Sequence, residues 1–167
     1  MLHRVTMVPI RRILCPVDFS EGAETALAQA LFLARGLGAE VEVVHAWETP
    51  IVIRPDLVVW TEGSSGVALA EVVKSRADTA MKQLLDKLAP DEHARVEVKI
   101  LHGPPAETIV GYAREHGHDL IVVASHGRTG LSRWMLGSVA ERVVQRAPCP
   151  VMVVHRAPEA GALSEAS

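Results

Sequence analysis

Short, continuous runs of apolar and often β-branched residues alternate along the chain with stretches in which apolar positions recur every three or four residues. Three of the runs are clear: Ile13 to Val17, Val41 to Ala46 and Leu120 to Ala124. Runs of this kind suit strands that are buried on both faces of a sheet. Two weaker runs, Val96 to Leu101 and Val151 to Val154, complete the set. We therefore expect five strands.

Helical spacing fills most of the intervals between these strands. The first helix is expected to begin at Ser20, whose hydroxyl can cap the free amides, and to end at Gly36 and Gly38. Further helices are expected at residues 69–88, 106–115 and 138–146. This alternation of strand and helix is typical of an α/β protein with a parallel sheet.

The interval between the second strand and the second helix is different, because residues 48–66 contain prolines, glycines and apolar clusters around Ile51 and Val58. Connections inside a compact domain usually have about 4 to 6 residues. We expect a lid or a contact surface here. Residues 1–156 are expected to form a single domain, and residues 157–167, which are small and polar, a flexible tail.

Composition narrows the function classes. The chain has 167 residues, of which 49% are hydrophobic and 22% charged, and a net charge of -3. A chain without clustered Lys and Arg is a poor candidate for binding nucleic acid or acidic membranes. No stretch is a signal peptide or reaches the about 18 apolar residues that span a bilayer, so we expect a cytoplasmic protein. Cys15 and Cys149 are too few for a disulfide framework and are expected to serve as small apolar residues.

The first strand ends in Cys15-Pro16-Val17-Asp18-Phe19-Ser20, which places a carboxylate just beyond its carboxyl end. In open α/β sheets, ligands bind at that edge, where the strand order reverses. If the first two units wind one way and the last two the other, Asp18 faces the loop that follows Ala124. The alternative, which the residues leave open, is that Asp18 braces its own turn or caps the first helix.

The loop after the fourth strand runs from Ala124 to Ser138 and contains Gly127, Gly130 and Gly137. Glycines let main-chain amides approach a ligand, and Ser138 adds a hydroxyl at the start of a helix. Free amides and the positive end of the helix dipole together predict an anion site. The loop matches neither the Gly-Lys-Ser phosphate loop nor the Gly-x-Gly-x-x-Gly dinucleotide motif.

The spacing of this loop resembles that of the universal stress protein family. Nucleotide-binding members of that family carry Gly-x-x-Gly, nine residues, and then Gly-Ser or Gly-Thr. In this chain Gly127 is followed by nine residues and then by Gly137-Ser138. The resemblance extends over nearly the whole chain, through the segments Ile13 to Ser20, His45-Ala46, Gly103 to Ile109 and Pro148 to Val154.

The resemblance implies the adenine nucleotide alpha hydrolase-like fold, an open five-stranded parallel sheet in the order 3-2-1-4-5 with helices on both faces. It also implies a site for ATP or AMP, with Mg²⁺ or Mn²⁺ as a further option on the phosphates, and a homodimer that pairs the last strand, Val151 to Val154. The implied nucleotide-binding residues are Pro16, Val17, Asp18, Ala46, Val123, Ala124, Gly127, Arg128, Gly137, Ser138 and Val139.

Two positions depart from the family pattern. Ala124 stands where the first glycine of the motif is expected, and Ala46 where a valine is usual. A methyl group at position 124 is tolerable if the backbone there is ordinary, but it crowds the ribose if glycine serves close approach. The substitution leaves the location of the site unchanged, whereas the affinity for nucleotide depends on which of these two cases holds.

Three functions remain open at this point. The favoured one is a nucleotide-responsive stress or regulatory module. The second is a slow ATPase, for which Asp18 and His126 are the only visible candidates to orient water. The third is a nucleotide-free dimerisation protein. The segment His116-Gly117-His118-Asp119 offers metal-ligand types, but no third cluster accompanies it, so we expect a solvated turn.

Overall fold

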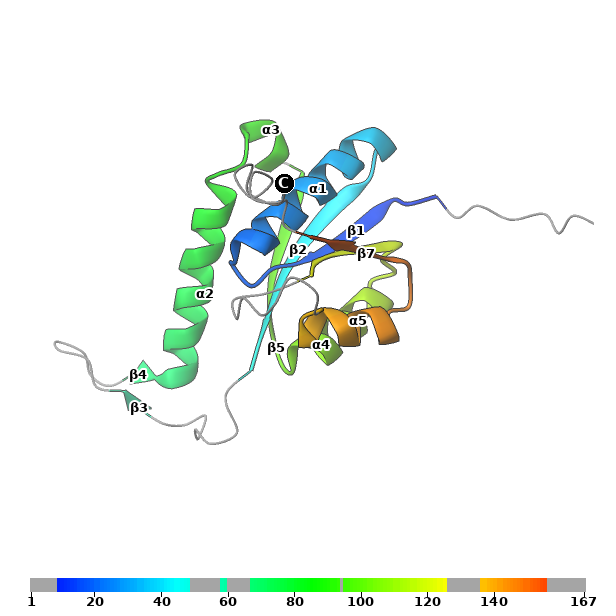
Figure 1. The fold of residues 1–167 in the computed structure, drawn as a ribbon. Helices are drawn as coiled ribbons and strands as arrows, with labels where there is room; N and C mark the ends of the chain where they lie inside the picture. The colour runs from blue at the N-terminus through cyan, green and yellow to red at the C-terminus, as the bar shows by residue number, and fades with distance from the viewer. Residues whose placement is uncertain (1–8, 49–57, 60–66, 94, 126–135, 156–167) are drawn as a thin grey trace, which may run out of the picture.

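A computed structural model describes residues 9–48, 58–59, 67–93, 95–125 and 136–155 of the chain. Its centre is a five-stranded parallel sheet in the order β5-β2-β1-β6-β7 (Figure 1). The strands are β1 (Arg12–Pro16), β2 (Glu40–Trp47), β5 (Val96–His102), β6 (Leu120–Ala124) and β7 (Val151–Val154). Numbered among themselves, these strands have the order 3-2-1-4-5, so the predicted sheet is confirmed.

Five helices accompany the sheet within the described residues: α1 (Glu21–Leu37), α2 (Leu69–Leu85), α3 (Pro90–His93), α4 (Pro105–Glu115) and α5 (Ser138–Arg146). The fourth predicted helix matches α5, whereas the second was predicted three residues too long. The chain leaves α2 after Leu85 through two turns and then forms the short α3 before β5. Pro90 therefore begins a new helix, as proline does at a first helical position, instead of only ending the preceding one.

The connection from 48 to 66 contains structure that the sequence did not predict. Residues Val58–Val59 (β3) pair antiparallel with Val67–Ala68 (β4), which lie directly before α2. The rest of the connection, at 49–57 and 60–66, lies outside the described residues, as does the tail at 157–167. Whether the connection serves as a lid or a contact surface therefore stays a prediction.

Helices cover both faces of the sheet, and each face has its own apolar core. The side chains of Ile13 and Cys15 join the core under α1 and α2, while that of Leu14 joins the core under α4 and α5 (Figure 1). Because successive side chains of a strand point to opposite faces, a strand covered on both sides is mostly apolar on both of them. This explains the continuous runs in the sequence. Burial also raises the pKa of the Cys15 thiol to about 12, which suits an unreactive core residue.

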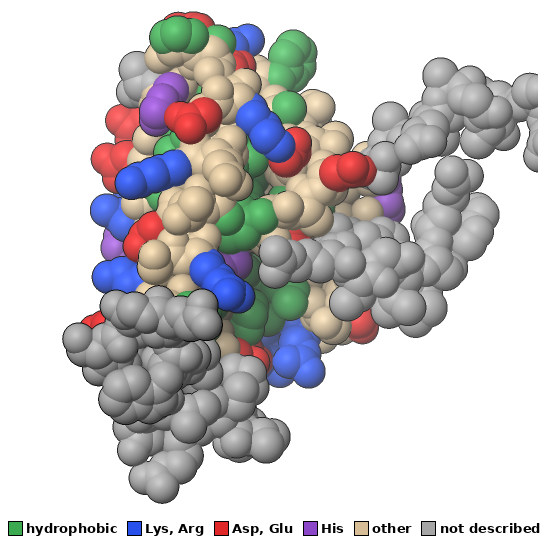
Figure 2. All heavy atoms as spheres, turned by 90° about the vertical axis from the view of Figure 1, so that its left-hand side faces the viewer, with side chains coloured by type: hydrophobic (Ala, Val, Ile, Leu, Met, Phe, Trp, Pro, Cys, Tyr) green, Lys and Arg blue, Asp and Glu red, His purple; other side chains and the backbone are tan. Residues whose placement is uncertain are grey.

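Ion pairs join the outer surfaces of the helices. Lys87 pairs with Glu24 of α1, and Arg35 of α1 pairs with Glu92 of α3. On the face that carries α2, acidic and basic side chains are interspersed and do not gather into a patch of one sign (Figure 2). Within the described part of the chain, no helix has both the length and the apolar character needed to cross a membrane.

Helix α1 begins at the predicted Ser20 cap and ends at Gly38, the second of the two glycines that were predicted to stop it. The Ser20 hydroxyl accepts a hydrogen bond from the Ala23 amide at 3.2 Å, and Gly38 closes the helix in the left-handed conformation with a φ of 66°. In that conformation a Cβ atom meets the neighbouring carbonyl, whereas glycine has no such conflict. Gly36, by contrast, lies inside the helix with no atom near the position of an added Cβ.

We expect opposite effects from alanine at these two glycines. Gly38→Ala should lower the free energy of unfolding by about 1 kcal/mol, because alanine must adopt the left-handed conformation. Gly36→Ala should raise it by about 0.5 to 1 kcal/mol, because alanine is the better helix former. Urea denaturation of the two variants checks both signs, and a loss of stability in each would contradict this account of the helix end.

Candidate functional site

A cavity of about 310 Å³ opens at the carboxyl edge of the sheet, between β1 and β6. The connections that follow these two strands leave in opposite directions: β1 leads through α1 to β2 on one side, and β6 leads through α5 to β7 on the other. Open α/β sheets bind ligands in such a crevice.

Every predicted site residue that the structure describes lines this cavity: Pro16, Val17, Asp18, Ala46, Val123, Ala124, Gly137, Ser138 and Val139. The remaining two, Gly127 and Arg128, lie outside the described residues, as does His126. The cavity is also lined by residues that were not predicted for the site: Ala23, Pro105, Ile109, Ser125 and Ala140. The signal for Pro105 and Ile109 was available, since a helix that follows a parallel strand begins at the carboxyl edge.

Asp18 fulfils both of the structural roles that the sequence left open. Its Oδ1 atom accepts hydrogen bonds from the Ser20 amide at 3.1 Å and from the Ser20 hydroxyl at 2.6 Å. The same hydroxyl oxygen caps α1. Asp18 thus braces its own turn and also lines the cavity. The brace fixes the carboxylate where a ligand would meet it.

The start of α5 forms the wall opposite Asp18. The Gly137 amide donates to the Ser125 carbonyl at 2.7 Å, and the Ser125 amide donates to the Val154 carbonyl at 2.9 Å. The two ends of the glycine-rich loop are therefore joined to each other and to β7. The Gly137 amide is consequently not one of the free donors that the sequence suggested.

The amides that follow Gly137 are placed differently. The helical ladder of α5 begins with the Glu141 amide, which donates to the Gly137 carbonyl at 2.9 Å, and no side chain of the described residues caps the helix. The amides of Ser138, Val139 and Ala140 precede that bond and have no acceptor within the helix. Together with the helix dipole, they favour an anion at this end of the cavity.

Ala124 ends β6 in ordinary backbone geometry, since among the described non-glycine residues only Phe19 has a positive φ. Its half-buried side chain lines the cavity with Ala46, which stands at the end of β2. The methyl group of Ala124 therefore costs no backbone strain. Its effect is confined to the space that it takes from a ligand.

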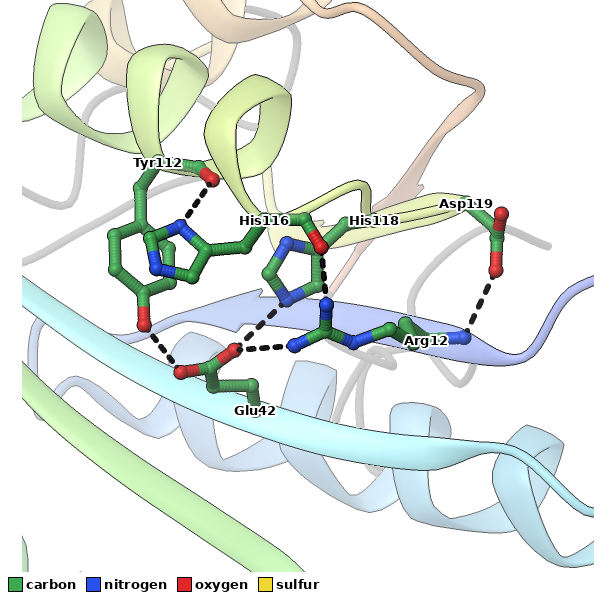
Figure 3. Close-up of polar contacts among 6 residues, drawn as sticks. All are labelled: Arg12, Glu42, Tyr112, His116, His118 and Asp119. Atoms are coloured by element: carbon green, nitrogen blue, oxygen red, sulfur yellow. Dashed lines mark hydrogen bonds and ion pairs between the residues drawn. The ribbon is translucent and has the colours of Figure 1, made fainter.

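A second polar cluster lies at the opposite, amino edge of the sheet and was not predicted (Figure 3). Glu42 of β2 is 5% exposed and accepts hydrogen bonds from the Tyr112 hydroxyl and, at 3.0 Å, from Nε2 of His118. Its Oε2 also lies 3.6 Å from the Arg12 guanidinium. Asp119 accepts from the main-chain amide of Arg12 at 3.0 Å. The cluster ties β1, β2 and α4 together.

This cluster corrects the prediction of a solvated turn at 116–119 in one respect, because the His118 side chain is fully buried, whereas His116 and Gly117 are exposed. Burial lowers the pKa of His118, although the neighbouring Glu42 carboxylate opposes the shift. Burial and the same carboxylate raise the pKa of Tyr112. The signal for the cluster was Glu42 itself, a charged residue inside an apolar run.

Within the described residues no group of three or more His, Cys, Asp or Glu side chains could hold a metal ion.

Fold and cavity together define an open α/β protein with a crevice at the point where its strand order reverses. The family model described as the universal stress protein family matches residues 9–155. This chain therefore belongs to the universal stress protein family, and its sheet is the adenine nucleotide alpha hydrolase-like fold.

Individual relatives agree with this assignment. Universal stress protein MJ0531 of Methanocaldococcus jannaschii is 34% identical over 87% of this chain and 82% of its own length. The solved structure of protein MJ0577, from the same organism, has a TM-score of 0.70 at 28% identity and covers 91% of this chain and 100% of its own. A universal stress protein in complex with cAMP has a TM-score of 0.62 at 18% identity, covers 89% and 98%, and shares the fold.

The buried His118 predicts a loss of stability in acid. In the unfolded chain this ring takes up a proton as the pH falls through the ordinary histidine pKa of about 6.5, whereas in the folded protein its pKa is lower. The unfolded state then binds more protons, so the free energy of unfolding decreases as the pH falls below that value. His118→Gln, which keeps an amide donor near Glu42 but does not titrate, should have a flatter profile.

Urea denaturation of both proteins, repeated from about pH 7 to about pH 5, measures the difference across the window set by the histidine pKa. Comparing the two profiles removes the contribution of the other histidines. Parallel profiles would assign the acid sensitivity to other groups.

Proposed function

We propose that this chain binds an adenine nucleotide, ATP or AMP, in the cavity at the carboxyl edge and acts as a nucleotide-responsive stress or regulatory module. The observation that carries the proposal is the gathering of Asp18, Ala46, Val123 and the start of α5 around one crevice at the strand-order reversal. These residues come from four separate segments. Their convergence supports a built site.

The chemistry of the walls suggests how the nucleotide lies. Val17 and Ala46 offer an apolar surface for the base, and the braced Asp18 carboxylate accepts hydrogen bonds from ribose hydroxyls. The phosphates belong at the other wall, near Ser138 and Val139, because the helix dipole attracts negative charge there and Asp18 repels it. The cAMP bound by one solved protein of this fold is consistent with such a ligand class.

A charge reversal at Gly137 tests this arrangement. Gly137 is the N-cap residue of α5 with a φ of -63° and a ψ of 147°, which asparagine and aspartate both adopt well. Gly137→Asp should therefore keep the helix but repel the phosphates, and we expect ATP to bind about tenfold or more weakly, a difference of about 1.4 kcal/mol. Calorimetric titration of ATP, with Mg²⁺ and with a chelator, measures the effect.

Gly137→Asn is the matched control, because it has nearly the same size and capping ability without the charge. It should bind ATP more tightly than Gly137→Asp. Mass spectrometry of any nucleotide released on denaturing the wild-type protein identifies the natural ligand. Equal ATP affinity in the wild type and both variants would show that the phosphates do not bind at this wall.

We also propose that β7 pairs with the same strand of a second copy to form a homodimer. Strand β7 is an edge of the sheet, and within the described residues only β6 pairs with it. The carbonyls of Pro150, which precedes β7, and of Val154, which ends it, point toward β6 and accept hydrogen bonds from the Ile121 and Ser125 amides. The alternation of a strand then directs the Val153 amide outward. Proteins normally pair or cover such an edge.

Val153→Pro should abolish the dimer, because proline removes the outward donor while the bonds to β6 remain. Val153→Ala, which keeps the amide and also shortens the side chain, should remain dimeric. Size-exclusion chromatography with light scattering distinguishes the two states. A wild-type protein that is monomeric at every concentration would refute the dimer itself.

A further inference from the structure

The segment between β1 and α1 has an unusual backbone. Phe19 has a φ of 63°, in the left-handed region, and it lies between Asp18 and the α1 cap Ser20. A bulky residue in this region is strained, so contacts elsewhere must hold it. Val17 and Asp18, on the same segment, line the candidate nucleotide cavity. Whatever holds Phe19 therefore also shapes the wall of the cavity.

His45 of β2 supplies two such contacts. Its Nδ1 atom lies 2.8 Å from the Val17 carbonyl oxygen, and its ring packs on that of Phe19 with centroids 4.5 Å apart and an interplanar angle of 40°. The Val17 amide, meanwhile, donates to the Val44 carbonyl at 2.8 Å. Both main-chain polar groups of Val17 are thus bound to β2. The imidazole provides the second of these bonds beyond the end of β1, which closes at Pro16.

The hydrogen bond determines the form of the imidazole. A carbonyl oxygen only accepts, so Nδ1 of His45 carries the proton and donates it. The protonated ring donates from the same atom, so the contact is kept in either charge state. His45 therefore holds the segment by geometry and needs no proton transfer.

We propose that His45 is a positioning residue for the nucleotide site. Its side chain is not among those that line the cavity; it acts through Val17 and Phe19, which keep Asp18 presented to the ligand. Loss of His45 releases the strained backbone at Phe19 and turns the Asp18 carboxylate away from its place. This inference rests on the proposed nucleotide site, and the test below separates the two.

Three substitutions test the two contacts of His45, separately and together. His45→Asn places an amide donor near the position of Nδ1 but removes the ring, whereas His45→Phe keeps a ring and removes the donor. His45→Ala removes both. We expect ATP affinity to decrease about tenfold or more in His45→Ala, with smaller losses in His45→Asn and His45→Phe. Titration calorimetry provides the affinities, and urea denaturation of the ligand-free proteins provides their stabilities.

Gly38→Ala is the stability control, because it is expected to destabilise the fold at the far end of α1 without touching the cavity. It should bind ATP as the wild type does. A double-mutant cycle with Phe19→Gly gives a second readout, since glycine adopts a φ of 63° without strain. The loss of affinity caused by His45→Ala should be smaller in the Phe19→Gly protein than in the wild type.

The outcomes distinguish the inference from the proposed function. If the wild type binds ATP and His45→Ala binds it equally well, or loses only as much as Gly38→Ala, His45 has no positioning role. If the wild type does not bind ATP, the proposed function fails. Amide hydrogen exchange at Ser20, whose amide donates to Asp18, then still tests the backbone argument. Exchange should be faster in ligand-free His45→Ala, and an unchanged rate would overturn the inference.

Discussion

The pairing of β1 with β6 is the constraint on which the rest of the molecule depends. These strands lie in the middle of the sheet, with Ile13 opposite Leu120 and Leu14 opposite Ile121, and their connections leave in opposite directions. A crevice at their carboxyl ends is therefore a consequence of topology. The apolar side chains that bury this pair on both faces, such as Ile13, Leu14 and Ile121, fix the position of the site as they form the core.

Among the described residues the crevice has few charged side chains, and main-chain amides at the start of α5 provide further polar groups. Among the described residues that line it, Asp18 is the only one with an ionisable side chain. The other wall offers the amides at the start of α5, which depend on the joining of Ser125 to Gly137. A site of this kind is sensitive to backbone position. The contacts that hold its loops, including those of His45, consequently matter as much as the residues that line it.

The sequence predicted those parts of the fold that follow from local pattern. Strands β6 and β7 and helix α5 have their predicted bounds, because buried runs and a glycine before an amphipathic stretch are local signals. The pairing of β3 with β4 was missed, since two-residue strands have no periodicity to detect. The end of α2 was placed too late because helical spacing continues to Leu88 after the hydrogen-bond ladder has changed.

The candidate site, like the fold, was predicted only where a local sequence pattern exists. The resemblance carried by the spacing of Gly127 and Gly137-Ser138 predicted nine of the residues that line the cavity and missed five, Ala23, Pro105, Ile109, Ser125 and Ala140, whereas the partners in tertiary hydrogen bonds were not predicted. The use of the Gly137 amide by Ser125 and the burial of His118 against Glu42 both join residues that are far apart in the chain or across a loop. The two edges of the sheet therefore differ in kind. At the amino edge the buried Glu42 carboxylate pairs with Arg12 and accepts hydrogen bonds from Tyr112 and His118, whereas at the carboxyl edge the first amides of α5 have no acceptor within their helix.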